Sequence, residues 1–190
     1  MSVVTAKVLI RTPRESKLME ITSRFISYIE QATPGQIEQA SKWYLEAEKV
    51  ANKVAENLKS NLEVGASVVS AFSPRERWVS NVTKALQYSV GKPVTGLPNN
   101  LRMAELALSE GFKALRGPKT NAFAKAIAGD EEAVVVDVWM MRASGLGVDS
   151  PSRKQYNDVA QAIRNAAVKF GLTPRTAQAL VWIIVRGSAE

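Results

Sequence analysis

Lys119 and Asp137 are the two side chains whose types and surroundings best suit chemistry, and they lie eighteen positions apart. Lys119 follows Gly117-Pro118 at the start of an apolar helical pattern, where the positive end of the helix dipole favours a neutral, nucleophilic amine. Asp137 follows the run Val134-Val135-Val136, and a carboxylate in apolar surroundings needs a partner or a use. The two side chains are therefore our candidate catalytic pair.

Each of these residues also has a structural explanation. Asp137 comes directly before a helical segment, where an aspartate is a favoured N-cap. A lysine in a Gly-Pro-Lys-Thr turn also suits an exposed side chain or a simple phosphate contact. Tryptophans at helical spacing, such as Trp78, Trp139 and Trp182, suit core packing. From the residues alone, both explanations stay open.

The chain contains no cysteine and no histidine, which excludes several classes of site. Disulfides, iron–sulfur clusters held by cysteine, Cys/His zinc sites and catalytic triads with an imidazole are ruled out. We therefore expect no metal site, no iron–sulfur cluster and no other cofactor. The 25 Lys and Arg residues exceed the 18 Asp and Glu residues and give a net charge of +7. This charge suits a polyanionic partner such as nucleic acid, although many basic proteins are simply soluble.

Length and hydropathy predict a soluble helical protein. No apolar run approaches the roughly 20 residues of a membrane span, and the first four residues lack the features of a signal peptide. We expect a cytoplasmic protein of a bacterial or phage-infected cell, with no membrane partner. With 46% apolar residues, the 190-residue chain can bury the core of one domain.

Apolar residues recur with the period of an α-helix along most of the chain, after a short β-prone run at 8–10. In 73–90 the order Ser73-Pro74-Arg75-Glu76 predicts a helix capped by Ser73, with proline in the first turn. Periodicity leaves a short strand open for 65–72. The expected fold is an all-α bundle of about eight to ten helices, at about 16–31, 37–61, 65–72, 73–90, 100–109, 118–128, 138–144, 153–169 and 174–186.

Two short helices joined by Gly117-Pro118 suit a helix-hairpin-helix, whose backbone N–H groups bind a DNA phosphate without reading the sequence. The surrounding residues resemble the helix-hairpin-helix DNA glycosylase (endonuclease III-like, HhH-GPD) superfamily, most of all its uncharacterised phage and actinobacterial members. In that superfamily a hairpin of the form L-P-G-x-G-x-K-T precedes an apolar helix, a turn and a Val-Asp pair. The resemblance lies in 115–122, in the Gly129-Asp130 turn and in 134–137 followed by Arg142, and it spans about 65–146.

The resemblance implies a division of the chain and a mechanism. A glycosylase-like core at 65–146, with its hairpin at 111–128, would lie between N-terminal helices at 16–64 and closing helices at 150–190. Lys119 matches the nucleophilic lysine of lyase-competent members, and Asp137 matches the superfamily's aspartate. In such enzymes a nucleotide is flipped out of the duplex, the lysine attacks the sugar C1′, and the aspartate stabilises the positive charge on the sugar.

Further residues receive expected roles, with double-stranded DNA as the partner and a monomer as the favoured state. The resemblance leaves room for a monovalent cation bound at the hairpin. Base stacking is expected of three aromatic residues, Phe72, Trp78 and Trp139. DNA contacts are expected from Arg116, Gly117, Thr120, Lys125, Arg75 and Arg77.

The chain departs from the superfamily's pattern at two places. Leu115 stands where the first hairpin glycine is usual, and Ala114 stands where proline is usual. Leucine disfavours positive φ, so we expect a remodelled turn and a weaker phosphate site. The glutamine that fills the gap left by a flipped base is absent, and Phe72 is the nearest residue.

Three functions therefore stay open. The first is a DNA N-glycosylase, with or without lyase activity. The second is an enzyme that uses the same scaffold to modify thymine-derived bases in phage DNA, as some relatives in the resembled superfamily do. The third is a catalytically inactive DNA-binding or interaction module.

Overall fold

A computed structural model of the protein describes residues 12–187, so the β-prone run at 8–10 lies outside the described residues. Residues 12–187 form nine α-helices, one 3-10 helix and no strand, which confirms the expected all-α fold. The elements are α1 (Pro13–Glu30), α2 (Pro34–Asn57), α3 (Leu62–Ala71), α4 (Trp78–Ser89), α5 (Pro98–Glu110), η1 (Gly111–Ala114), α6 (Pro118–Ile127), α7 (Val138–Ser144), α8 (Arg153–Phe170) and α9 (Pro174–Arg186).

Local capping chemistry explains where several helices begin. Thr12 and Thr33 each form a capping box and are followed by a proline in the first turn, so α1 and α2 begin three residues earlier than the apolar pattern predicts. Ser152 forms a third capping box with Gln155 at the start of α8. These caps satisfy backbone N–H groups that have no partner inside the helix.

The predicted helix start at Ser73 is wrong, because α4 begins at Trp78. The Glu76 carboxylate does not return to the backbone of Ser73 to complete a capping box. It accepts a hydrogen bond from the Ser80 hydroxyl (2.7 Å) and pairs with Lys84 instead. Residues 73–77 consequently form a loop, in which Arg75 has a left-handed φ of 62°. Such a φ is uncommon for a residue with a Cβ and is found most often at turns and functional sites.

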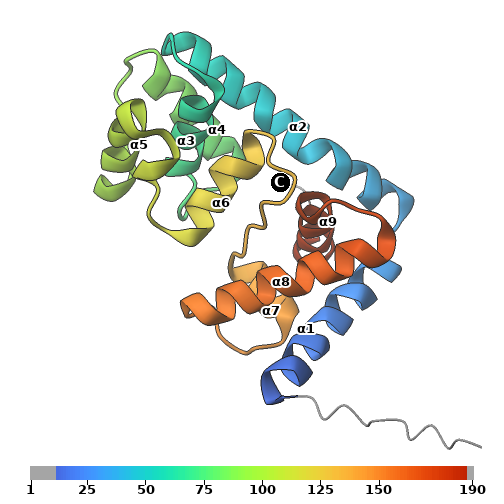
Figure 1. Cartoon of the computed structure of the whole chain (residues 1–190). Helices are drawn as coiled ribbons and strands as arrows, with labels where there is room; N and C mark the ends of the chain where they lie inside the picture. The colour runs from blue at the N-terminus through green and yellow to red at the C-terminus, as the bar shows by residue number, and fades with distance from the viewer. Residues whose placement is uncertain (1–11, 188–190) are drawn as a thin grey trace, which may run out of the picture.

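The helices form two lobes that share the long helix α2 (Figure 1). One lobe contains α3, α4, α5, η1 and α6, and the other contains α1, α7, α8 and α9. Helix α2 packs against α3, α4 and α6 in the first lobe and against α9 in the second. The buried segment 133–136 runs from α6 towards α7, so it carries the chain from the first lobe back to the second.

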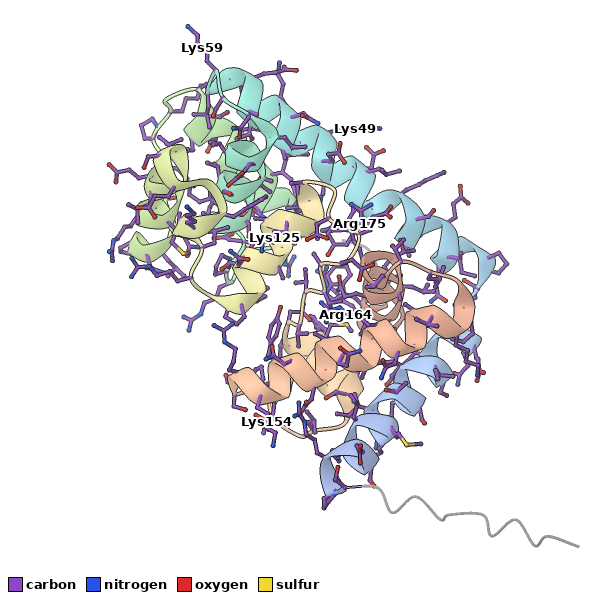
Figure 2. The ribbon with its side chains drawn as sticks, in the orientation of Figure 1. Lys49, Lys59, Lys125, Lys154, Arg164 and Arg175 are labelled. Atoms are coloured by element: carbon purple, nitrogen blue, oxygen red, sulfur yellow. The ribbon has the colours of Figure 1, made fainter. Side chains whose placement is uncertain are left out.

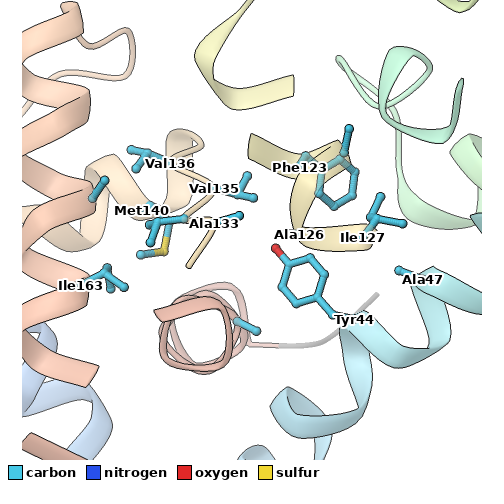
Figure 3. Packing of buried hydrophobic residues seen from close by; sticks show 14 of the residues in the cluster. Tyr44, Ala47, Phe123, Ala126, Ile127, Ala133, Val135, Val136, Met140 and Ile163 are labelled. Carbon is cyan, nitrogen blue, oxygen red and sulfur yellow. The ribbon is translucent and has the colours of Figure 1, made fainter. Parts of the chain in front are cut away.

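The core continues across the junction between the lobes. Figure 3 shows Tyr44 from α2 and Phe123 from α6 on one side of the junction, Met140 from α7 on the other, and Val135 from the segment before α7 between them. A Cβ on Gly65 would lie 2.1 Å from the Ala51 carbonyl oxygen, so glycine lets α3 approach α2 closely. Within residues 12–187, no helix combines the length and the apolar character needed to cross a membrane.

Candidate active site

A cavity of about 260 Å³ lies where the two lobes meet. Its walls come from α2, from the loop before α4, and from α4, α6, α7 and α9. Lys119, in the first turn of α6, and Asp137, directly before α7, both line it. The fold therefore brings the candidate pair to one cavity from two separate lobes.

Both carboxylate oxygens of Asp137 accept hydrogen bonds. The backbone N–H of Met140 donates to Oδ1 at 3.0 Å, so Asp137 is the N-cap of α7, as one of the two explanations for this residue requires. The indole Nε1–H of Trp182 donates to Oδ2 at 2.9 Å. These two donors fix the orientation of the carboxylate, and Asp137 still faces the cavity. Capping and a role in the cavity are thus compatible in this residue.

The amine of Lys119 makes no hydrogen bond or ion pair with any residue in the described part of the chain. The side chain is half-buried. Burial lowers the pKa of Lys119, because removal from water disfavours the charged amine, and the negative charge of Asp137 opposes this shift. A lysine of this kind reaches its neutral, nucleophilic form at a lower pH than an exposed lysine does.

Tyr156 of α8 joins the backbone next to Lys119 with the backbone next to Asp137. Its hydroxyl accepts a hydrogen bond from the Val136 N–H at 3.3 Å. The hydroxyl proton faces the carbonyl oxygens of Val134 at 3.0 Å and Pro118 at 3.3 Å. Burial raises the pKa of Tyr156, so the hydroxyl keeps this proton. Tyr156 is therefore a positioning residue for both members of the pair.

Six aromatic side chains line the cavity. All four tryptophans of the chain line it, namely Trp43, Trp78, Trp139 and Trp182. The Trp43 ring centroid lies 5.2 Å from that of Trp78 and 6.0 Å from that of Trp182. Flat apolar walls of this kind suit a flat heterocyclic ligand, which can stack on them.

Three buried polar residues, Ser73, Asn81 and Gln178, also line the cavity. The sequence analysis assigned no site role to Asn81, Gln178, Trp43 or Trp182. The sequence did contain a clue to Gln178, because this polar residue lies among Ala177, Ala179 and Leu180 in a largely apolar helix. A polar side chain at a core position usually has a specific partner.

Some of the other predicted site residues line the cavity, some line a neighbouring groove, and some line neither. Arg77, Trp78 and Trp139 line the same cavity as the candidate pair. Arg116 and Lys125 line a neighbouring groove between α6 and α8, with Lys125 and Arg164 on either side of it (Figure 2). Arg75 and Gly117 are exposed, and neither lines this cavity or this groove.

Two residues with predicted roles in DNA binding, Phe72 and Thr120, are buried in the structure. Phe72 is only 1% exposed and packs edge-on against Tyr88 in the core, so it is not available to stack on a base in this conformation. Thr120 is buried, and its hydroxyl donates to the Gly117 carbonyl at 3.1 Å. This hydrogen bond supports the first turn of α6 and turns the side chain away from solvent.

The hairpin turn is built without a left-handed residue at 115–117. Leu115 has φ −92° and is 2% exposed, and Gly117 has φ −72°. The left-handed glycine lies earlier, at Gly111, which ends α5 with φ 54°. Leu115 is held in the core with an ordinary φ, so this turn requires no residue in the left-handed region.

Fold and cavity together define an all-helical protein with a lysine and a carboxylate at the junction of two lobes. The chain belongs to a family of unknown function, DUF7178, whose model matches residues 8–189. No curated protein and no solved structure matches the chain. In the described residues, no three acidic side chains gather into a group that could hold a metal ion.

Proposed function

We propose that this protein is a DNA base-processing enzyme, a DNA N-glycosylase with lyase chemistry, that acts on a nucleotide flipped into the cavity. One observation carries the proposal: the free amine of Lys119 and the fixed carboxylate of Asp137 line one cavity with aromatic walls. The resemblance of 65–146 to the helix-hairpin-helix glycosylases supports the same assignment. The net charge of +7 suits DNA as the partner.

In this mechanism Lys119 is the nucleophile. Its neutral Nζ attacks the sugar C1′, a bond from Nζ to C1′ forms, and the glycosidic bond to the base breaks. The base leaves with the bonding electrons and takes up a proton, while Nζ loses one. The sugar ring then opens to a Schiff base. Loss of a C2′ proton and of the 3′-phosphate from this Schiff base breaks the strand.

Asp137 stabilises the positive charge that develops on the sugar as the base departs. A fixed carboxylate is most effective in a site that excludes water, because the local dielectric is low and no side chain has to reorganise. The hydrogen bonds from Trp182 and Met140 provide this fixed orientation. Stacking on the tryptophans offsets part of the cost of removing the base from the duplex.

Borohydride trapping on a panel of duplexes with damaged or modified bases tests the proposal. We expect a covalent protein–DNA adduct with at least one duplex, and loss of the adduct in Lys119→Ala. Lys49→Ala is the control, because Lys49 pairs with Glu46 on α2 and lines neither the cavity nor the groove between α6 and α8. Equal trapping of Lys119→Ala and the wild type would show that another amine is the nucleophile.

Two replacements of Asp137 separate its charge from its capping role. Asparagine is as good an N-cap as aspartate, whereas alanine loses about 1 kcal/mol of helix-capping free energy. We expect Asp137→Asn to unfold at a higher temperature than Asp137→Ala, while both lose trapping. Full trapping in Asp137→Asn would mean that the carboxylate charge is not used.

The same reactions distinguish the alternative functions. Nucleosides that change mass while strand and base are retained would indicate base modification on this scaffold. Salt-sensitive DNA binding with no product and no adduct on any duplex would indicate an inactive binding module.

A further inference from the structure

The proposed mechanism leaves three polar residues of the cavity unused. Ser73, Asn81 and Gln178 are 8%, 2% and 4% exposed, and all three line the cavity. Ser73 Oγ and Asn81 Oδ1 are buried and make no hydrogen bond in the described part of the chain. A buried polar atom without a partner costs about 1–3 kcal/mol, so native structures seldom keep one without a reason. A ligand that enters the cavity would supply the missing partners.

Tyr44 fixes the orientation of the Gln178 amide. The Tyr44 hydroxyl donates to Gln178 Oε1 at 2.8 Å. Burial raises the pKa of Tyr44 far above its ordinary value, so this hydroxyl stays a donor throughout the working pH range. Since Oε1 is occupied, the Gln178 side chain is left with its amide nitrogen as a donor. That nitrogen makes no hydrogen bond with the described residues.

Asn81 faces the cavity from the opposite lobe, because it lies on α4 whereas Gln178 lies on α9. Its amide nitrogen also lacks a hydrogen bond within residues 12–187. The cavity thus offers two amide N–H donors, one from each lobe, and one free acceptor, Asn81 Oδ1. These groups match a ring in which an N–H lies between two carbonyl oxygens: the carbonyls accept from the two amides, and the N–H donates to Oδ1. With the fixed Gln178 donor facing the 4-position of the ring, an exocyclic amino group there would set donor against donor, whereas a carbonyl would accept.

We infer that Asn81 and Gln178 read the flipped base, and that they select a 2,4-dioxopyrimidine ring, the ring of uracil and thymine. This inference rests on the proposed function for its substrate class, a flipped DNA base. The volume of about 260 Å³ lies just below the roughly 300–1,000 Å³ of typical ligand pockets, which favours a single ring over a purine. The tryptophan walls hold the faces of the ring, and the two amides select its edges.

Tryptophan fluorescence of the full-length protein tests the inference without any reaction, because all four tryptophans line this cavity. The probes are 1-methyluracil, 1-methylthymine, 1-methylcytosine and 9-methyladenine, whose methyl group stands in for the sugar. We expect the two dioxopyrimidines to bind at least about tenfold more tightly than the other two, because a buried donor facing an amino group stays unpaired.

Three variants show which residues carry the preference. Asn81→Leu and Gln178→Leu should each weaken 1-methyluracil binding by about tenfold and leave 1-methylcytosine binding nearly unchanged. Tyr44→Phe retains both amides but frees that of Gln178 to rotate, so the uracil-to-cytosine preference should fall while stacking is kept. Gln87→Leu is the matched control on α4, because Gln87 is exposed and outside the cavity.

The outcomes separate this inference from the proposed function. Equal binding of all four probes, a preference for cytosine or adenine, or no quenching by any probe would each overturn the base assignment, whatever the trapping result. Selective dioxopyrimidine binding without any trapped adduct would keep the base assignment and overturn the lyase mechanism.

Discussion

At the scale of single residues, the environment of Lys119 decides how the site can act. Lys119 is held in a half-buried position beside the aromatic cavity. Burial lowers its pKa, and the Asp137 charge limits how far the pKa falls. The carboxylate therefore has two opposing effects: it favours the charged amine before reaction and stabilises the charged sugar during it.

The pH dependence of Lys119 reactivity follows from this balance. An amine reacts with acetic anhydride only when neutral, so the midpoint of its pH profile reports its pKa. We expect the midpoint for Lys119 to lie below that of a lysine in a short unstructured peptide, because burial lowers the pKa of Lys119. Asp137→Asn removes the charge that raises this pKa, so the midpoint should move to still lower pH. Mass spectrometry of labelled peptides measures both shifts, and a Lys119 midpoint at or above that of the peptide lysine would contradict them.

Sequence reasoning singled out the pair and the neighbouring Arg77, Trp78 and Trp139, but it missed the two amide side chains of the cavity. Lys119 and Asp137 were predictable because each stands in a short local pattern, a hairpin turn and a valine run. Asn81 and Gln178 lie on helices whose apolar faces point to the core, and a lone amide on such a face does not tell which cavity it borders. Their common position arises only when the fold brings α4 and α9 to the wall of the same cavity.

At the scale of helices, existence and type were predictable along most of the chain, because most of the α-helices have a side-chain N-cap and an apolar face. The start of α4 was not predictable, since Ser73, Pro74 and Glu76 satisfy a local pattern that Lys84 and Ser80 override. The energy of a capping box is of the order of 1 kcal/mol, and an ion pair with a second hydrogen bond can outweigh it. Residues 73–77 consequently stay in a loop at the cavity wall.

Close packing of α3 on α2 makes a second prediction at this scale. Gly65→Ala would place a Cβ 2.1 Å from the Ala51 carbonyl oxygen, which is backbone and cannot rotate away. Overpacking of this kind costs about 1–3 kcal/mol, so we expect a lower unfolding temperature by circular dichroism. Gly35→Ala on α2 is the control, because nothing lies within 4 Å of its Cβ and the change should be neutral or stabilising. An unfolding temperature for Gly65→Ala equal to that of Gly35→Ala would show that the helices separate easily.

At the scale of the whole molecule, basic side chains from both lobes line one groove beside the cavity. Arg116 and Lys125 come from the hairpin and α6, and Arg153 comes from the start of α8. None of these three forms an ion pair with the residues described here. A further cavity, lined by Lys119, Asp137 and Arg153, lies between this groove and the aromatic cavity. A DNA strand with one nucleotide flipped into the aromatic cavity could place its neighbouring phosphates along this groove.

The salt dependence of DNA binding tests that path. Each phosphate neutralised by a basic side chain contributes about 0.9 to the slope of log affinity against log salt on duplex DNA. Replacing Arg116, Lys125 and Arg153 together by alanine should therefore lower the slope by about 2 to 3 and weaken binding to all duplexes alike. Lys49→Ala is the control, since Lys49 pairs with Glu46 on α2, away from the groove. A slope that stays the same in the triple variant would place the DNA on another face, and the hairpin would then have no part in holding the strand.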